Sequence, residues 1–493
     1  MTSRSLKPAL LLVACCVAVS SCASRRVSGV AEPYPDLASY LEARRHLVER
    51  EHARRLSSAL VLSPEEEAAS RRLLALRRAE EARVGAYFPP AHSFLQGETK
   101  RLIDTSPLLG VMRRLPKGGI LHLHGAAGGD FRWLIAQATY RPDCYVFTGE
   151  GQSPVRGTLR LFADPPAGDW RSVVALRDQA PDARAFDEQL YQSITLGEQE
   201  RGAPDIWEEF TNCFRRAWRL FDDPEVRAGH WRRMLDLLER ENVQYVEFRG
   251  WPADDAIVAD ARRRGPDFAV KFIPVAGRSG SRERAKGQLA LTLAERERDP
   301  GLVAGFDLVE EEDESHSTLF FVEEILAARR EAERRGFSLP LFLHSGETNR
   351  AESENLRDAL LLGAPRIGHG LALARHPLLM EMVRERGVAV EVCPVSNQVL
   401  GYVPDLRSHP AVAYINAGIP VVISPDDPGL TRHTFSHDYY EAFMAWELDL
   451  RELKQLAMNS LVYSAMDPEE KQRALFVWRK RWAEFVRWLN AAG

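Results

Sequence analysis

The sequence is poor in cysteine and shows no excess of basic residues. Of its six cysteines, three lie within the first 22 residues, which leaves Cys144, Cys213 and Cys393 far apart in the rest of the chain. Three thiols form at most one bridge, so a disulfide framework is excluded, although a Cys144–Cys213 pair stays open. Lysine and arginine total 65 against 70 acidic residues, a formal net charge of −5. This balance argues against a nucleic-acid-binding surface.

Two signatures of hydrolytic enzymes are also missing. A serine hydrolase carries Gly-x-Ser-x-Gly between a strand and a helix, and residues 277–280 (Gly-Arg-Ser-Gly) do not meet that pattern. A zinc site of the cytidine-deaminase type needs His-x-Glu and Pro-Cys-x-x-Cys on a short stretch. Here Cys393 precedes Pro394, in the reverse order, and a second cysteine is absent nearby. Both classes are therefore rejected.

The N-terminus has the pattern of an export signal. Two basic residues precede an apolar run over 8–19, and Cys22 follows directly after small residues. The run is too short to span a bilayer, so we expect residues 1–21 to be a cleaved signal peptide. The cleavage site resembles that of bacterial lipoproteins, in which Cys22 is lipidated, and Ser24 in place of Asp favours the outer membrane. Plain secretion is the alternative. We expect an exported protein anchored by lipid, facing the periplasm or the cell surface.

The rest of the chain divides by composition. With 493 residues and 45% apolar content, it can bury a large core. Residues 22–37 are predicted to be a tether. Residues 38–110, rich in Arg, Glu, Ala and Leu at helical spacing, predict an N-terminal helical arm that packs on the main domain or on a partner subunit. Residues 111–493 form the predicted main domain, with a largely helical insertion over 130–242.

Short apolar runs alternate with amphipathic helical segments through the main domain. We expect strands at 119–124, 243–249, 268–276, 302–309, 339–344, 365–369, 388–393 and 419–424. This rhythm fits an α/β fold, either a doubly wound sheet or a TIM-type (β/α)8 barrel. Nearly every run ends in a polar residue able to do chemistry, and barrel enzymes build their sites at the carboxyl ends of the strands. We therefore predict the barrel.

Four residues at these strand ends are candidate metal ligands. His122 and His124 are two residues apart, so on a strand both imidazoles point to the same face. His344 ends the fifth run and Asp426 follows the eighth, which completes a set of three histidines and one carboxylate. Imidazole and carboxylate ligands without thiolate suit zinc in a hydrolytic site, and iron or manganese stays open.

Three further residues are candidates for the chemistry itself. Glu347 lies three residues after His344, where its carboxyl can reach a substrate and act as a general acid or base. His369 ends the sixth run with glycine on both sides, which permits close approach to its ring. Asp427 adjoins Asp426 and points in a different direction, so that it can face the substrate.

Several motifs together resemble the adenosine deaminase family of metallo-dependent hydrolases, most closely its secreted growth-factor branch. They are Leu-Pro-Lys-Gly-Gly-Ile-Leu-His-Leu-His at 115–124, Leu-His-Ser-Gly-Glu at 343–347, Arg-Ile-Gly-His-Gly at 366–370, Glu-Val-Cys-Pro-Val-Ser-Asn-Gln-Val-Leu at 391–400 and Ser-Pro-Asp-Asp-Pro at 424–428. The resemblance runs from about residue 38 to about residue 487. It implies a barrel, one zinc ion, and a helical arm that relatives use to form homodimers.

The resemblance also implies a role for each candidate residue. Zinc binds to His122, His124, His344 and Asp426. Glu347 shuttles the proton, His369 orients the attacking water and Asp427 meets purine N7. Trp207 and Glu310 are expected as further substrate contacts. The implied reaction belongs to purine nucleoside metabolism and converts adenosine to inosine and ammonia.

Two departures from the family pattern fall on substrate recognition. The family carries an Asp just after the His-x-His pair, near the sugar, and this chain has Gly125. A family glycine whose amide meets purine N3 is replaced by Glu310, whose side chain is expected to crowd that spot. The acidic run 310–314 is interpreted as a solvated loop. The alternatives are a metallo-hydrolase of another aminopurine or cyclic amidine, and a catalytically idle surface lipoprotein that binds nucleosides or a protein.

Overall fold

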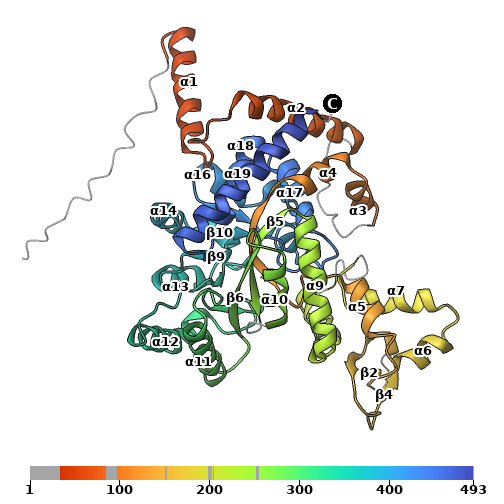
Figure 1. Ribbon diagram of the computed structural model, residues 1–493. Coiled ribbons are helices and arrows are strands. Elements are labelled where there is room, and N and C mark those ends of the chain that lie inside the picture. Colours follow the sequence, from red (N-terminus) through yellow and green to blue (C-terminus); the bar gives the residue numbers. More distant parts are fainter. Residues whose placement is uncertain are drawn as a thin grey trace, which may run out of the picture. The chain divides into compact units, whose positions relative to one another are not determined.

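The computed structural model in Figure 1 describes residues 34–84, 97–149, 153–197, 203, 205–250 and 255–491. The predicted signal peptide and Cys22 lie outside these residues. The chain divides into two units, one that ends at Glu51 and one that begins at His52. Among the described residues, none of the helices combines the length and apolar character needed to cross a membrane.

Two parallel sheets make up the barrel in the second unit. The first has the order β1-β5-β6-β7 and the second β11-β10-β9-β8. The bounds are β1 Gly118–His124, β5 Val243–Gly250, β6 Ala269–Gly277, β7 Asp307–Val309, β8 His344–Ser345, β9 Arg366–His369, β10 Ala389–Val392 and β11 Val421–Ile423. Parallel bridges Leu123–Asp426 and Phe306–Leu341 join the two sheets at both seams. The (β/α)8 barrel is therefore confirmed, and each predicted run overlaps one strand.

The burial of the strands explains why they appear as unbroken apolar runs. Strands β9, β10 and β11 are buried throughout because side chains fill the barrel and helices cover its outside. The helices that follow or flank these strands are α9 Pro224–Arg240, α10 Asp255–Arg263, α11 Arg282–Arg298, α12 Val322–Arg334, α13 Asn355–Leu361, α14 Pro377–Arg386, α15 Pro394–Val399, α16 Ala411–Ala417, α17 Phe435–Ala445, α18 Leu450–Val462 and α19 Pro468–Ala491. Helix α12, for example, buries Ile325, Ala328 and Ala332 along one stripe.

The segment between β1 and β5 holds more than the predicted helices. It contains α5 Phe131–Ala138, α6 Val173–Gln179, α7 Ala183–Ser193 and α8 Ile206–Ala217. It also forms an antiparallel sheet, β3-β2-β4, from Thr158–Leu161, Cys144–Phe147 and Trp170–Ser172, which the sequence reading missed. Strands of three or four residues are too short to show a clear alternation. Cys144 in this sheet is a buried free thiol, so the Cys144–Cys213 pair is not formed.

The helices of the predicted arm differ in their surroundings. They are α1 Leu37–Arg54, α2 Pro64–Val84, α3 Gly97–Asp104 and α4 Pro107–Arg114. Helix α2 packs on α19 and α18 (Figure 1), and Glu66 Oε1 accepts hydrogen bonds of 2.6 Å from both Trp482 Nε1 and Lys454 Nζ. Helix α1 has no buried residue and exposes Leu41 and Leu47. Part of the arm thus covers the barrel.

Candidate active site

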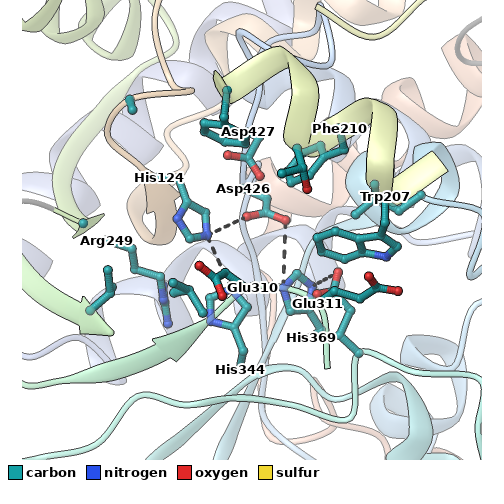
Figure 2. A pocket seen from close by; sticks show the side chains of 18 of the residues that line it. His124, Trp207, Phe210, Arg249, Glu310, Glu311, His344, His369, Asp426 and Asp427 are labelled. Atoms are coloured by element: carbon teal, nitrogen blue, oxygen red, sulfur yellow. Dashed lines mark hydrogen bonds and ion pairs between the residues drawn. The ribbon is translucent and has the colours of Figure 1, made fainter. Parts of the chain in front are cut away.

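The polar residues at the carboxyl ends of the strands converge on one point. His122 and His124 end β1, His344 begins β8, His369 ends β9 and Asp426 follows β11. The Nε2 atom of His344 lies 3.0 Å from that of His122 and 3.4 Å from that of His124. Oδ1 of Asp426 lies 3.3 Å from the Nε2 atoms of both His122 and His124. Four predicted ligands therefore form one cluster, and Figure 2 shows three of them, His124, His344 and Asp426.

The donor atoms of this cluster fit a metal ion. A tetrahedral zinc with Zn–N bonds of about 2.0–2.1 Å separates its nitrogens by about 3.3 Å, close to the spacings found here. Asp426 Oδ1 is buried and accepts no hydrogen bond from the part of the chain that is described. Burial also lowers the pKa of His124 to about 3, so its imidazole is neutral, as a metal ligand must be.

Two buried carboxylates hold the outer nitrogens of two of these imidazole rings. His122 Nδ1 lies 3.0 Å from Glu391 Oε2 on β10, and His344 Nδ1 lies 2.7 Å from Asp307 Oδ2 on β7. Arg249 on β5 donates to both carboxylates, at 2.6 Å to Glu391 and 2.7 Å to Asp307. Burial raises the pKa of Asp307, but the charges of His344 and Arg249 outweigh this and hold it below its usual range. These contacts fix the ring tautomers so that the Nε2 lone pairs face the metal position.

Sequence reasoning did not assign Glu391 and Arg249. Both lie inside strands that are otherwise apolar or buried, and both side chains are fully buried. A charged residue within a buried strand indicates a buried ion pair or hydrogen bond, because such a group is costly to bury without a partner. This feature of the sequence could have identified both residues. The partner of each residue lies on another strand, far away in the sequence. The ion pair could therefore be identified only from the structure.

We expect Asp307→Asn to weaken metal retention by roughly 10–100-fold. The substitution keeps the shape of the side chain but removes the charge that orients His344 through its Nδ1 atom. Competition between the protein and a chelator of known affinity measures the change. Glu323→Gln, which alters an exposed side chain on α12, serves as the control. Equal metal affinity in the Asp307 variant and the unaltered protein would contradict this account.

Glu347, His369 and Asp427 lie beside the metal cluster. Glu347 Oε1 is 3.5 Å from His369 Nδ1, and His369 Nε2 is 3.9 Å from Asp426 Oδ2. Burial, followed by the charge of Asp426, raises the pKa of Glu347 and of Asp427 well above the usual range of a carboxyl. Burial lowers the pKa of His369 well below that of a free imidazole. These surroundings favour the protonated form of both carboxyls and the neutral form of the imidazole.

The backbone at two of these residues is strained. His369 and Asp426 have φ angles of 61° and 63°, in the left-handed region that non-glycine residues rarely adopt. Side-chain contacts hold the pair in place: Ser396 Oγ donates to Asp426 Oδ2 at 2.8 Å, and Asn397 Nδ2 lies 3.2 Å from His369 Nδ1. Such strain persists where the surrounding structure fixes a functional group in a required direction.

A cavity of about 300 Å³ opens over the cluster. Helix α8 covers it with the apolar face formed by Trp207, Phe210 and Phe214, which recur at helical spacing (Figure 2). Trp207 Nε1 donates to Tyr402 Oη at 2.7 Å, so this indole is held in place. The predicted substrate contacts Trp207, Glu310 and Asp427 all line the cavity. Its volume is at the lower end of the roughly 300–1,000 Å³ typical of small-molecule sites.

The two departures from the family pattern have structural explanations. A Cβ atom at Gly125 would lie 2.3 Å from the ring of Trp231, so this buried indole fills the space next to Gly125. Glu310 keeps the backbone of a glycine, with φ of 82°. Its Oε2 accepts a hydrogen bond of 2.8 Å from Ser279 N–H. The Glu310 side chain thus folds onto the loop before α11 and stays on the cavity wall.

The interpretation of the acidic run 310–314 as a solvated loop is wrong for Glu312. This side chain is buried, 6% exposed, and accepts hydrogen bonds from backbone N–H groups of the segment that carries Glu347. Five acidic residues in a row usually repel one another and stay in solvent. One of them can still be buried at little cost where backbone N–H groups donate hydrogen bonds to its carboxylate.

Comparisons with known proteins match this chain to one family. Family models match as "Adenosine deaminase" over residues 239–476 and "Adenosine/AMP deaminase N-terminal" over residues 11–112. Adenosine deaminase 2 of Sus scrofa is 35% identical over 90% of this chain and 93% of its own length. Adenosine deaminase 2 of Dictyostelium discoideum is 29% identical over 92% of this chain and 88% of its own length.

The fold also matches a solved amidohydrolase. The structure from Burkholderia ambifaria, with bound Zn, superposes with a TM-score of 0.58 at 20% identity, covering 78% of this chain and 96% of that one. At this identity the match supports the fold alone. Together with the coverage of the adenosine deaminase 2 relatives, it leads to one conclusion: the chain belongs to the adenosine deaminase family of metal-dependent hydrolases, in the adenosine deaminase 2 branch.

Proposed function

We propose that the protein catalyses metal-dependent hydrolytic deamination of adenosine or a related aminopurine nucleoside, giving the inosine-type product and ammonia. The observation that carries this proposal is a set of buried polar atoms beside the cavity that lack hydrogen-bond partners within the described chain: Glu347 Oε1, His369 Nε2, Asp426 Oδ1 and Asp427 Oδ1. Buried polar groups are normally paired. A metal ion and a polar heterocycle together supply the missing partners.

We propose zinc as the metal, one ion per chain, held by His122, His124, His344 and Asp426. The absence of thiolate from this set of imidazole and carboxylate donors supports that choice. The neighbouring amidohydrolase from Burkholderia ambifaria contains Zn. When bound, zinc lowers the pKa of water to near 7 and so makes a nucleophile available at neutral pH.

The residues around the metal position have complementary proton states. Burial and the charge of Asp426 raise the pKa of Glu347, which favours the protonated form of its carboxyl. Glu347 can donate this proton to purine N1, which makes C6 more electrophilic toward water. Water then forms a bond to C6, and the amino group takes up a proton released by that water and leaves as ammonia. His369 is neutral and can take a proton from the attacking water. Burial and Asp426 raise the pKa of Asp427 as well, which favours the protonated form that can donate to purine N7.

A panel of aminopurines tests the proposal. We expect ammonia from adenosine, deoxyadenosine or a related nucleoside, and a kcat/KM for AMP that is lower by about 100-fold or more. Among the described residues that line the cavity, Arg249 is the one arginine or lysine, and it is already paired with Asp307 and Glu391. Glu310 and Glu311 would repel a phosphate. No ammonia from any of these compounds would refute the proposal.

A different aminopurine is the second candidate substrate. Trp231 fills the space beside Gly125, next to the metal-binding His124. The family carboxylate expected near the sugar is absent there, so recognition of the ribose is weakened. A higher kcat/KM for adenine or a base-modified purine than for adenosine would favour this candidate.

We also propose that the protein is exported and anchored through a lipid on Cys22, with outer-membrane localisation, because the N-terminal sequence has the lipoprotein pattern. Cys22→Ala should release the protein from the membrane fraction.

The exposed apolar residues Leu41 and Leu47 on α1 support a homodimer formed through the arm. Leu41→Glu with Leu47→Glu should then give monomers in sedimentation, whereas Glu42→Gln should not.

A further inference from the structure

Glu312 differs from its acidic neighbours in its burial. It follows β7 in the run Glu310–Glu314, and its side chain is buried, whereas the Glu314 side chain is 67% exposed. A carboxylate is costly to bury unless hydrogen-bond donors compensate it. The partners of Glu312 therefore indicate what this residue does.

Both oxygens of Glu312 bind the segment after β8. Oε2 accepts from Gly346 N–H at 3.0 Å, and Oε1 accepts from Glu347 N–H at 2.9 Å. Asn355 Nδ2 donates to Oε2 at 2.7 Å and so fixes the carboxylate from its other side. Gly346 has φ of 77°, a turn that presents two successive N–H groups to one acceptor. The next residue of the run, Asp313, accepts from Thr348 Oγ1.

The segment held in this way carries the proton donor of the site. Glu347 is buried, and its Oε1 lies 3.5 Å from His369 Nδ1, beside the cavity. That atom has no hydrogen bond from the described residues, so it is available to a substrate. The backbone position from which this carboxyl extends is held by the hydrogen bonds that Glu312 accepts from Gly346 N–H and Glu347 N–H. Proton transfer needs the position of the carboxyl oxygen relative to the ring to be held within a fraction of an ångström.

We propose that Glu312 is a positioning residue that holds the backbone of Gly346 and Glu347 so that the Glu347 carboxyl faces the reacting ring. The inference rests on the proposed deaminase function for its kinetic consequence, and on the structure alone for its effect on the backbone. Glu312 touches neither the metal position nor the cavity wall. Its removal should therefore affect turnover more than substrate binding.

Glu312→Gln tests the proposal with little change of volume. The glutamine oxygen can still accept one hydrogen bond. Its NH2 group, however, is a donor and cannot accept from the second N–H group of the segment, so that hydrogen bond is lost. We expect kcat to fall by roughly 30-fold, with KM within threefold and metal content unchanged, because a hydrogen bond to a charged group is lost. We also expect amide hydrogen exchange over 344–348 to become at least tenfold faster. Glu314→Gln, in the same run, should change neither kcat nor the rate of hydrogen exchange over 344–348.

Two outcomes would overturn the proposal: a kcat within threefold of the unaltered protein, or exchange over 344–348 that stays as slow as before. If the unaltered protein deaminates no aminopurine, the proposed function fails, and the exchange measurement still decides whether Glu312 holds the segment. A melting temperature close to that of the unaltered protein shows that the variant is folded. If Glu312→Gln does not fold, Glu312→Asp, which keeps both acceptor oxygens, replaces it, with smaller changes in the same directions expected.

Discussion

Glu347→Gln should lower kcat for adenosine deamination by about 10³-fold and leave KM within about threefold. The glutamine amide keeps the size of the side chain but cannot deliver a proton to the ring, and general acid–base catalysis typically contributes 10²–10⁴-fold. Glu347 is the buried carboxyl beside the cavity whose pKa burial and Asp426 raise well above its usual range. Steady-state rates of ammonia release, fitted for kcat and KM separately, give the result.

The control for this prediction is Glu352→Gln, an exposed carboxyl five residues further along the chain. Its kinetics should match those of the unaltered protein. Metal content should be the same in both variants, because Glu347 is outside the group of proposed ligands. A Glu347→Gln variant that keeps more than a tenth of the original kcat would remove Glu347 from the proton-transfer role.

His344→Ala should abolish both metal binding and measurable deamination. The Nε2 atom of His344 lies close to the Nε2 atoms of the other two proposed histidine ligands, His122 and His124. Without it, three of the four proposed ligands remain. A metal that binds only the folded state stabilises it by RT ln(1 + [L]/Kd), about 4 kcal/mol at a thousandfold excess over Kd. We therefore expect added zinc to raise the unfolding temperature of the chelated, unaltered protein and to leave that of the variant unchanged.

His316→Ala is the matched control for the loss of a ligand. This imidazole is exposed and stacks on Phe320, with ring centroids 3.9 Å apart, and it is not part of the metal cluster. Its removal should leave metal content and activity intact. Retention of one zinc per chain by His344→Ala would mean that the ion binds elsewhere.

Much of the barrel and of the metal cluster could be predicted from the sequence for a simple reason. A parallel barrel buries both faces of each strand, so its strands appear as apolar runs, and its site residues follow those runs. His122 and His124 share a face by the two-residue period of a strand. The small sheet β3-β2-β4 has strands of only three or four residues and was therefore missed.

The supporting residues of the site were harder to predict because their partners are distant in the chain. Arg249 joins Glu391 and Asp307, which lie on β10 and β7, and no spacing within one strand reveals this pairing. Glu312 is the same residue type as the exposed Glu310 and Glu314, and the N–H groups that it meets set it apart from them. Trp231 beside Gly125 is a further case, since only the fold brings α9 against the end of β1.

The most direct test of the central claim is ammonia release from adenosine by the chelated protein before and after addition of one equivalent of zinc. The claim concerns a metal cluster that serves the deamination of an aminopurine, so both parts are measured in one preparation. We predict no detectable ammonia from the chelated protein and full activity at one zinc per chain. Equal rates with and without metal, or no ammonia from adenosine or any other aminopurine nucleoside after zinc is restored, would contradict the account.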